Sequence, residues 1–446
     1  MDHAVVIGAS IAGLLSAAAL HRRFAQVTVL DRDTLPAVDA HRRGAAQSRH
    51  AHGLLARGSE VMDELLPGLT AELVAQGAIR GDMQDRARHV HGGRRLARGS
   101  SGLTGVLVSR PLLEGQVRRR VSALPGVRVL AERTVTGLLS RRGRVTGVRL
   151  AEGELVPADL IVDASGRGSR TPLWLGDLGC RPPREERVTI DLRYSSREFR
   201  RRGDHLAGDL IAVVGPTPGV PRAGVALALE DERWAVTLAG YGAGPPHGHA
   251  DATACITTAA PPRGHDGFTA FAGTLAAPDL HHLVTTAEPL GEPRTYHTPA
   301  AVRRRYERLA SFPDGLLVIG DAVCSFNPLY GQGMTVAALE ARALLDPDLS
   351  PAAYFRRIAA VVDLPWEITV GADLRIATTA GRPTPRMRLI GAYLDRFHAA
   401  AEHDAELTRR FLRVTNLYDP PQALMSPPAL LRVLRSGAQR AVPVPA

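Results

Sequence analysis

The chain has 446 residues, of which 45% are hydrophobic and 4% aromatic, and its formal net charge is +10. It is longer than the ~250 residues at which a single hydrophobic core stops growing, so more than one lobe is expected. The chain contains no lysine; its arginines are scattered in short clusters, and aromatic side chains for base stacking are scarce, which argues against a nucleic-acid partner. Cys180, Cys255 and Cys324 are too far apart for a disulfide framework and indicate a reducing compartment.

The N-terminal segment has neither the basic region nor the cleavage site of a signal peptide. No apolar stretch reaches the ~20 residues that cross a membrane. The sequence therefore predicts a cytoplasmic protein with no membrane partner.

Residues 1–33 predict a strand, a turn, a helix and a second strand. The run 4–7 is apolar throughout, which suits a strand buried on both faces and is too short for a helix. Residues 11–24 are rich in Ala and Leu and predict a helix, and the β-branched run 27–30 ends at Asp31. This order defines a βαβ unit.

The turn 8–13 has the glycine spacing of a dinucleotide-binding site. Gly8 lets the chain leave the strand, Gly13 lets the helix approach the sheet, and Ser10 stands where such turns usually carry a second glycine. The free N–H groups at the helix N-terminus attract a pyrophosphate. Asp31 can accept from both hydroxyls of a ribose that lacks a 2′-phosphate, so FAD or NAD is expected rather than NADP.

An arginine- and histidine-rich loop, 41–52, then leads into a helix with apolar residues between 54 and 66. His50 and His52 lack a third residue at metal-ligand spacing, so polar contacts are expected of them. The candidates for binding a cofactor phosphate or the flavin edge are Arg42, Arg43 and Gln47. Solvated loop charge is the alternative for these three.

Further apolar runs each precede a turn or a helix start. The strand 103–108 precedes Ser109-Arg110-Pro111, which is a helix-start signal, and the helix continues through Val121. Strands are expected at 127–130 and 145–150. The run 160–162 then enters Asp163–Arg170, where a buried strand again ends in Asp, Ser and Gly.

From 187 to 242 the apolar period changes to two, which predicts antiparallel strands of a separate sheet. The glycines of 240–244 are followed by prolines and no helix, so they do not form a second nucleotide turn. Residues 240–266 are expected to be a loop crossing this lobe.

A buried strand returns at 315–319 and enters Gly320-Asp321. A helix is expected at 335–345, and helical spacing continues from 351 to 434. The last residues, 440–446, are expected to be unstructured.

Three motifs now stand in the order and spacing of one family: the Gly8 turn with Asp31, the stretch 163–166, and Gly320-Asp321 with the segment 328–333. Over most of its length the chain resembles single-component flavoprotein monooxygenases of the para-hydroxybenzoate hydroxylase type. Its sequence at 43–47, 109–113 and 327–331 looks most like that of a branch from bacterial natural-product pathways that includes polyether polyene epoxidases. Cys324, where aromatic hydroxylases often carry His, and Met334-Thr335, where they often carry Asn, depart from the family pattern.

The resemblance implies roles for individual residues. Asp321 would bind the ribityl hydroxyls, and the backbone of 331–334 would meet the isoalloxazine edge. Asp163 and Gly166 would lie near the pyrophosphate and the NAD(P)H approach, Arg110 would hold FAD, and Val135 would lie near the adenine. The expected cofactor-binding residues are Gly8, Ser10, Ile11, Ala12, Gly13, Asp31, Arg32, Arg43, Gln47, Arg110, Val135, Asp163, Gly166, Gly320, Asp321, Pro328, Gly331, Gly333 and Met334. No metal is expected.

The patterns and the resemblance together predict an α/β fold. It would combine a Rossmann-like FAD-binding domain, with a βαβ unit like that of glutathione reductase, an antiparallel-sheet substrate domain and a C-terminal helical region. The predicted division is FAD-binding domain 1–75, 100–182 and 295–365, substrate domain 76–99 and 183–294, helical region 366–436 and disordered tail 437–446.

The resemblance implies a monooxygenase that uses FAD, NAD(P)H and O2 to insert one oxygen atom into an apolar natural-product intermediate. Epoxidation or hydroxylation would proceed through a flavin C4a-hydroperoxide, so no side-chain nucleophile is assigned. The expected walls of the substrate site are the 187–242 sheet and the C-terminal helices, which are rich in Ala, Leu and Val. Whether the substrate is carried on a protein, and whether the enzyme is a monomer or homodimer, stay open.

Three other functions stay open. The chain could be a cyclase that keeps FAD only as structure, a flavin-dependent reductase or dehydrogenase, or a nucleic-acid-binding module. A flavin halogenase is disfavoured because that group relies on an active-site lysine, which this chain lacks.

Overall fold

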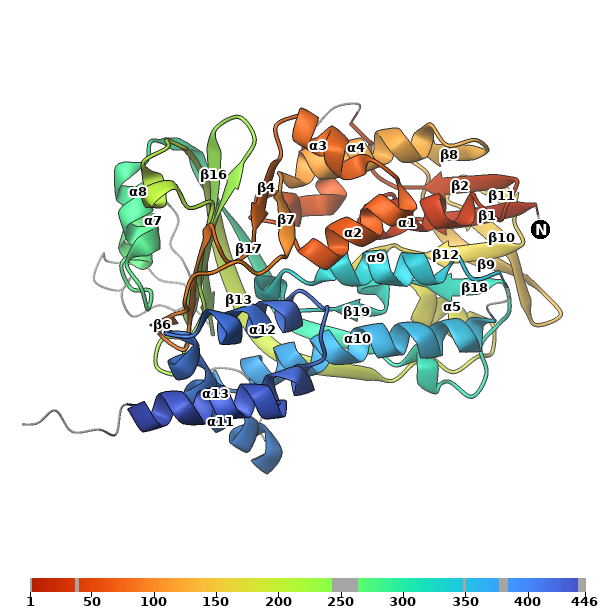
Figure 1. Cartoon of the computed structure of the whole chain (residues 1–446). Helices are drawn as coiled ribbons and strands as arrows, with labels where there is room; N and C mark the ends of the chain where they lie inside the picture. The colour runs from red at the N-terminus through yellow and green to blue at the C-terminus, as the bar shows by residue number, and fades with distance from the viewer. Residues whose placement is uncertain (1, 37–39, 243–263, 348–349, 377–383, 440–446) are drawn as a thin grey trace, which may run out of the picture.

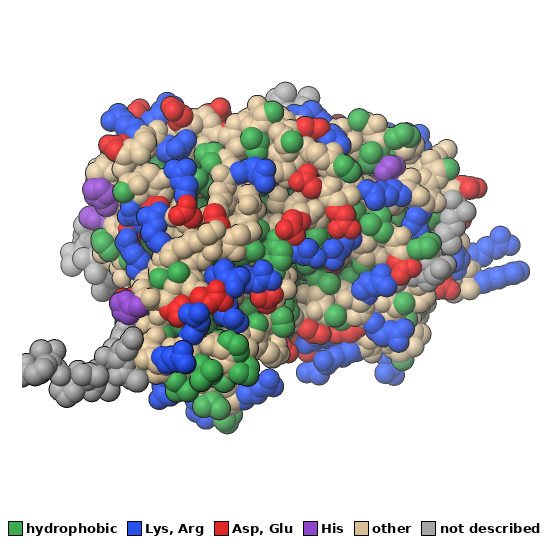
Figure 2. Space-filling view, in the orientation of Figure 1, with side chains coloured by type: hydrophobic (Ala, Val, Ile, Leu, Met, Phe, Trp, Pro, Cys, Tyr) green, Lys and Arg blue, Asp and Glu red, His purple; other side chains and the backbone are tan. Residues whose placement is uncertain are grey.

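The computed structural model describes residues 2–36, 40–242, 264–347, 350–376 and 384–439. Figure 1 shows a parallel sheet with its helices in one half of the molecule and a long antiparallel sheet in the other. The C-terminal helices α11, α12 and α13 lie beside the antiparallel sheet. On the face drawn in Figure 2, arginines are interspersed with acidic side chains, as the scattered clusters in the sequence predict.

The parallel sheet has the strand order β18-β12-β1-β2-β8. Every neighbouring pair is parallel, and β1 pairs with β2 on one side and β12 on the other. Ala4, Val5 and Val6 of β1 are fully buried, because the core that contains them also includes α1 and the strand 144–150, which pack against the sheet. Its strands are β1 (His3–Ile7), β2 (Gln26–Leu30), β8 (Val127–Leu130), β12 (Leu160–Asp163) and β18 (Leu316–Val318). The predicted α/β class is confirmed.

The helices packed around this sheet are α1 (Ile11–Leu20), α2 (Ala56–Leu65), α3 (Leu69–Ala75), α4 (Arg110–Ser122), α5 (Thr171–Asp177) and α9 (Gly333–Ala343). Helix α1 ends at Leu20, so the prediction that it reaches Phe24 is wrong. The chain turns away where Arg23 donates to the carbonyls of Leu344 and Asp346 at 2.9 and 2.7 Å. This contact ties the end of α1 to the segment after α9.

The antiparallel sheet has the order β19-β17-β13-β16-β15-β14-β5-β6, and only the β14–β5 pair is parallel. Its strands are β5 (Ala87–His91), β6 (Arg94–Arg95), β13 (Glu185–Arg200), β14 (Ile211–Val214), β15 (Arg222–Leu229), β16 (Arg233–Tyr241), β17 (Pro289–Arg304) and β19 (Cys324–Ser325). Helices α7 (His265–Ala272) and α8 (Asp279–Thr286) pack on it, and Phe199, Trp234 and Phe268 form their shared core. The predicted separate antiparallel sheet is confirmed.

The remaining described strands form two small three-stranded sheets. β3 (Gly53–Leu54) and β4 (Ile79–Asp82) flank β7 (Thr104–Leu107). β9 (Val135–Arg141), β10 (Arg144–Leu150) and β11 (Leu155–Pro157) form the other. The short 3₁₀ segments are η1 (Arg43–Arg49), η2 (Gly166–Gly168), η3 (His205–Gly208), η4 (Tyr306–Arg308), η5 (Gly320–Ala322), η6 (Pro328–Tyr330) and η7 (Pro421–Met425).

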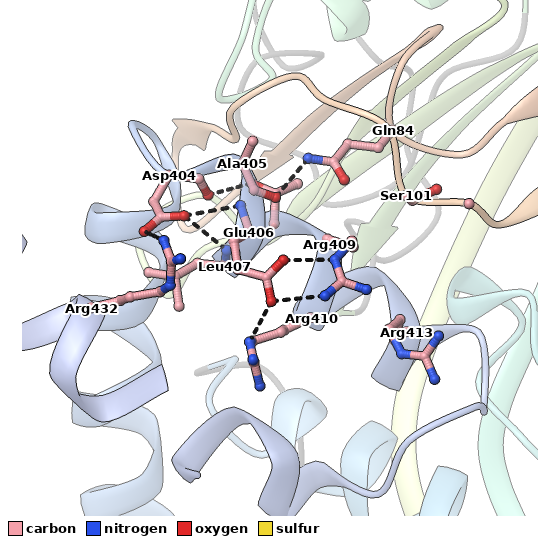
Figure 3. Close-up of polar contacts among 12 residues, drawn as sticks. Gln84, Ser101, Asp404, Ala405, Glu406, Leu407, Arg409, Arg410, Arg413 and Arg432 are labelled. Atoms are coloured by element: carbon pink, nitrogen blue, oxygen red, sulfur yellow. Dashed lines mark hydrogen bonds and ion pairs between the residues drawn. The ribbon is translucent and has the colours of Figure 1, made fainter. Parts of the chain in front are cut away.

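The predicted C-terminal helical region consists of α10 (Pro351–Asp373), α11 (Pro385–Ala401), α12 (Ala405–Thr415) and α13 (Pro427–Gln439). Figure 3 shows how polar groups hold α12. Asp404 accepts from the amides of Glu406 and Leu407 at 2.9 and 3.2 Å, and its other oxygen pairs with Arg432 of α13 at 2.8 Å. Gln84 donates to the carbonyl of Ala405 at 2.9 Å, which joins α12 to the segment before β5.

The predicted domain division stays a prediction. Its boundaries at 294/295 and 365/366 fall inside the continuous elements β17 and α10. The predicted disordered tail is wrong at its start, because α13 continues to Gln439. Most of the expected loop 240–266, Cys255 and the end 440–446 lie outside the described residues. Within the described ranges, no helix combines the length and apolar character needed to cross a bilayer.

Candidate functional site

The turn after β1 is built as the glycine spacing predicts. Gly8 has φ +105°, and a Cβ there would lie 2.6 Å from the carbonyl oxygen of Ala164. A Cβ on Gly13 would overlap the carbonyl oxygen of Gly8, so α1 reaches the sheet only because residue 13 has no side chain. Ser10 precedes α1 and makes no side-chain cap, which leaves the first amides, at Ile11 and Ala12, available to a ligand.

Ser10 instead joins a buried polar pair on α4. Its hydroxyl donates to Glu114 Oε2 at 3.0 Å and accepts from Arg110 Nη2 at 2.9 Å. Burial acts to raise the pKa of Glu114, but the guanidinium groups of Arg110 and Arg42 bring it below its usual value. Arg110 therefore stands at the N-terminus of α1, where the resemblance places an FAD-binding arginine.

Arg42 bridges this pair to the end of β2. Its guanidinium lies 2.6 Å from Glu114 Oε1, 3.3 Å from Asp31 Oδ2 and 3.2 Å from Asp33 Oδ2, and its side chain is only 6% exposed. The alternative that Arg42 is a solvated loop charge is therefore wrong. Arg32 is exposed and Gln47 is half-buried in η1, while the side chain of Arg43 lies outside the described atoms.

Most acceptor positions of the Asp31 carboxylate are already occupied by protein groups. Its Oδ2 accepts from the amide of Ala9 at 2.6 Å and from Arg42, and its Oδ1 accepts from the amide of Asp33 at 2.8 Å. A carboxylate offers about four acceptor positions, so one remains for a ribose hydroxyl while Arg42 stays in place. The expectation that Asp31 accepts from both hydroxyls stays a prediction. Val135 lies two residues beyond Arg133, whose amide donates to the Asp31 carbonyl at 2.8 Å.

Asp163 is fully buried at the end of β12, and its own loop surrounds it. Oδ1 accepts from the amide and hydroxyl of Ser165 at 2.9 and 2.5 Å, and Oδ2 from the hydroxyls of Ser169 and Thr171 at 2.5 and 2.6 Å. These bonds fit a residue that orders the loop. The predicted contacts of Asp163 and Gly166 with pyrophosphate or NAD(P)H stay untested. Gly166 has φ +79°, and a Cβ there would lie 4.0 Å from the Cβ of Asp321.

The loop after β18 joins the first turn. A Cβ on Gly320 would lie 2.9 Å from the Cβ of Ala12, and the Gly320 amide donates to Glu340 Oε2 at 2.6 Å. Asp321 is exposed and accepts no hydrogen bond from any described residue, although surrounding protein raises its pKa against the opposing effect of Arg167 and Arg110. A carboxylate that is both accessible and desolvated lines an interior space, so Asp321 is a free acceptor there.

Gly331 and Gly333 border open space. Gly331 has φ +66°, α9 begins at Gly333, and a Cβ on either residue would meet no atom within 4 Å. The residue before α9, Gln332, makes no side-chain cap, so the first amides of the helix are free. Pro328 is exposed, and Met334 is half-buried against the core. We call the segment 331–334 with Asp321 the cradle.

The cradle and the first turn fit FAD. The cradle offers an unpaired acceptor for ribityl hydroxyls and free amides for the flavin edge, and α1 offers free amides for phosphate.

A cluster of rings lies near Asp321 of the cradle. His50 Nδ1 lies 2.7 Å from Ser196 Oγ, and its ring centroid is 4.5 Å from that of Tyr194 and 5.8 Å from that of Tyr296. Burial lowers the pKa of His50 to about 3, so its ring is neutral at physiological pH. Burial also raises the pKa of Tyr194, and Asp321 is among the charges that act on it. His52 bonds the carbonyl of His50, so both histidines make the expected polar contacts.

A cavity of about 430 Å³ lies between the 41–52 loop and strands β13, β15 and β16. Its lining is mostly polar, in contrast to the apolar walls expected for a substrate site. Representative lining residues are His41, Arg49, His52, Arg110, Glu198 and Arg233.

Sequence reasoning missed one buried acid, Asp373 at the end of α10. Its Oδ1 accepts from Tyr241 Oη at 3.0 Å, Asn327 Nδ2 at 2.8 Å and Tyr330 Oη at 3.0 Å. Asp373 is 46 residues beyond Asn327 and 132 beyond Tyr241 in sequence. No local signal distinguished Asp373 from the other acids of the same helix, Asp363 and Glu367, which are exposed.

The fold and these turns define a flavoprotein with a Rossmann-type FAD-binding domain. The chain belongs to the FAD-binding domain family, whose model matches residues 2–346. This membership confirms the family resemblance found in the motifs.

The chain is 36% identical over 463 residues to protein Rv3254 of Mycobacterium tuberculosis, covering 97% of this chain and 93% of that protein. Its fold is shared with a single-substitution variant of HpxO from Klebsiella pneumoniae, a structure in complex with FAD (TM-score 0.62, 19% identity, 94% of this chain and 100% of that chain). It is shared too with PqsL of Pseudomonas aeruginosa, a probable FAD-dependent monooxygenase (TM-score 0.60, 17% identity, 84% and 98%).

Proposed function

We propose that this protein is an FAD-dependent monooxygenase that inserts one oxygen atom from O2 into an apolar compound, with NAD(P)H as reductant. The observation that carries the proposal is the cradle: an accessible, unpaired carboxylate at Asp321 beside the open N-terminus of α9. The buried ring of Tyr194 is close enough to Asp321 for its charge to act on the phenol, and the neutral ring of His50 packs on Tyr194. The fold shared with PqsL and HpxO supports the same proposal.

Bound FAD would supply the oxygen-activating chemistry, and the protein would supply binding and orientation. In this proposal Asp321 accepts from the ribityl chain, and the absence of side chains at Gly331 and Gly333 lets the flavin approach the α9 amides. The clustered rings of His50, Tyr194 and Tyr296 would form one aromatic side of the substrate space, and charged side chains of the cavity would form another. An aromatic side of this kind suits an electron-rich alkene or ring.

Several finer points belong to the same proposal. The branch resemblance at 43–47, 109–113 and 327–331 favours an intermediate of natural-product biosynthesis, with epoxidation ahead of aromatic hydroxylation. Three dispersed cysteines, two of them free in the described chain, suit a reducing cytoplasm.

The test combines cofactor loading with oxygen labelling. Purified protein is loaded with FAD, reduced anaerobically with NADPH or NADH, and mixed with ¹⁸O₂ in the presence of a panel of alkenes and phenols. We expect flavin reduction, O2 consumption and one ¹⁸O atom in the product.

The outcomes separate the competing functions. Product formed anaerobically by the oxidised enzyme, without label, would indicate the cyclase that keeps FAD as structure. Turnover that continues without O2 would indicate a reductase or dehydrogenase. Either result overturns the monooxygenase proposal.

A further inference from the structure

A single buried oxygen gathers three segments that are far apart in the sequence. Asp373 is fully buried at the end of α10, and its Oδ1 receives the hydroxyls of Tyr241 and Tyr330 and the amide of Asn327 within 2.8–3.0 Å. Tyr241 ends β16 of the antiparallel sheet, whereas Asn327 precedes η6 and Tyr330 ends it. The carboxylate therefore joins the C-terminal helices, the antiparallel sheet and the loop that leads into the cradle.

The bonds to Asn327 fix the shape of that loop. Asn327 caps η6, because its Oδ1 accepts from the amide of Leu329 at 3.0 Å while its Nδ2 donates to Asp373 and to Tyr241. Tyr330 hydrogen-bonds Asp373, Gly331 follows in the left-handed conformation, and α9 begins at Gly333, three residues after Tyr330. The hydrogen-bond partners of Asn327 and Tyr330 therefore help to fix the position of the first amides of α9.

We propose that Asp373 is the positioning residue of the cradle, holding the segment 327–331 in the shape that leaves the N-terminus of α9 open to the flavin. This inference rests on the proposed function in placing FAD at the cradle. Asp373 itself need not touch FAD or the substrate.

Because Asp373 is a buried acid, its positioning of the segment 327–331 is sensitive to pH. Oδ2 of Asp373 has no partner among the described residues, and burial raises the pKa of Asp373 to about 6 against the opposing effect of its three donors. The groups that face Asp373 are Tyr241, Tyr330 and Asn327, and burial keeps both phenols neutral. The buried arrangement of the 327–331 loop therefore favours the neutral acid, and this preference is lost as the pH rises from about 4 through 6 and Asp373 ionises.

The test compares Asp373→Ala, which removes the acceptor, with Asp373→Asn, which keeps an acceptor oxygen but cannot ionise. Glu367→Gln is the matched control, because Glu367 is an exposed acid on the same helix. Hydrogen–deuterium exchange of the peptide 327–334 is measured in FAD-free full-length protein at pH 5.5 and 7.5. It is expressed as protection relative to the intrinsic amide exchange rate at each pH, so that the proteins can be compared at one pH and between the two. FAD affinity is measured by fluorescence titration under the same conditions.

We expect Asp373→Ala to increase exchange in 327–334 and to weaken FAD binding about tenfold, while Asp373→Asn stays within about twofold of wild type at pH 5.5. Wild type and Glu367→Gln should lose protection in 327–334 between pH 5.5 and 7.5, and Asp373→Asn should not. If Asp373→Ala does not fold, Tyr330→Phe removes one of the donors and should give a smaller change in the same direction.

Wild-type exchange and affinity in Asp373→Ala, or an unchanged pH dependence in Asp373→Asn, would overturn the inference. A wild-type protein that binds FAD but incorporates no labelled oxygen would overturn the proposed function alone. Failure of wild type to bind FAD would overturn both.

Discussion

At the residue scale, the function depends on where single carboxylates find their partners. Asp163 ends the parallel strand β12 and Asp321 lies just after the parallel strand β18, yet Asp163 is saturated by three neighbours of its own loop, whereas Asp321 bonds no described residue. The first arrangement stabilises a loop, and the second leaves an acceptor for a ligand. Two acids at the carboxyl ends of neighbouring parallel strands therefore have different roles.

This difference gives the first prediction. Asp321→Ala should weaken FAD binding more than tenfold, because a hydrogen bond to an ionised acceptor contributes about 1.5–3 kcal/mol. Asp314→Ala is the control, since Asp314 is exposed just before the same strand. Fluorescence titration of FAD checks both variants, and equal affinities would remove Asp321 from the cofactor site.

At the element scale, the contact of α1 with the parallel sheet depends on Gly13. Gly13→Ala places a methyl group against the Gly8 carbonyl oxygen, so α1 must move away from β1. We expect a loss of about 1–3 kcal/mol in unfolding free energy and reduced FAD occupancy. Gly176→Ala in α5 is the control, because its Cβ would meet nothing within 4 Å. Urea unfolding and the flavin-to-protein absorbance ratio measure the two effects, and a Gly13→Ala protein as stable as the control would contradict this packing.

Helix α12 depends on a cap that also holds its neighbour. Asp404→Ala removes the acceptor for two α12 amides together with the ion pair to Arg432, so we expect a loss of about 1–2 kcal/mol. Arg432→Ala removes the ion pair alone and should change stability by less than about 1 kcal/mol, since the Arg432 side chain is 46% exposed. Thermal melts of both variants give the comparison. Equal losses would mean that the ion pair, rather than the cap, holds the helix.

At the scale of the whole molecule, buried histidines join separate parts of the chain. His398 of α11 stacks on His91 of β5 with 5.8 Å between ring centroids and lies edge-on to Phe411 of α12 at 5.1 Å. Burial lowers the pKa of His398 to about 4 and that of His91 well below its usual value. Neither ring nitrogen of His398 finds a hydrogen-bond partner in the described part of the chain. The docking of α11 on the antiparallel sheet therefore requires neutral rings.

The fourth prediction follows from the sign of these shifts. The unfolded chain binds protons at the ordinary histidine pKa of 6.5, and the folded chain binds them only near 4 at His398, so stability falls as the pH drops from about 6.5 toward 4. The His398 contribution is about 3 kcal/mol when complete. His398→Phe keeps a ring beside Phe411 and should reduce the loss between pH 6.5 and 4.5. Urea unfolding at both pH values measures it, and an unchanged loss would assign the acid sensitivity to other groups.

Sequence by itself determined the elements whose signals are local. The apolar runs at 4–7 and 160–162 must be buried strands because they have no polar face, and Gly8 and Gly13 are needed wherever a helix turns back so closely onto its strand. The motifs and their order also predicted the FAD-binding family, which the match over residues 2–346 confirms.

Only the tertiary structure decided how distant groups meet. Arg42 forms a buried bridge between Asp31 and Glu114, and Asp373 bonds Asn327 and Tyr241, contacts that no local pattern encodes. The end of α1 likewise depends on Arg23 bonding carbonyls more than 300 residues away. A side chain's charge state and free bonds depend on its neighbours in space, so the availability of Asp321 to a cofactor is set by the packed fold and not by the Gly-Asp motif that marks it.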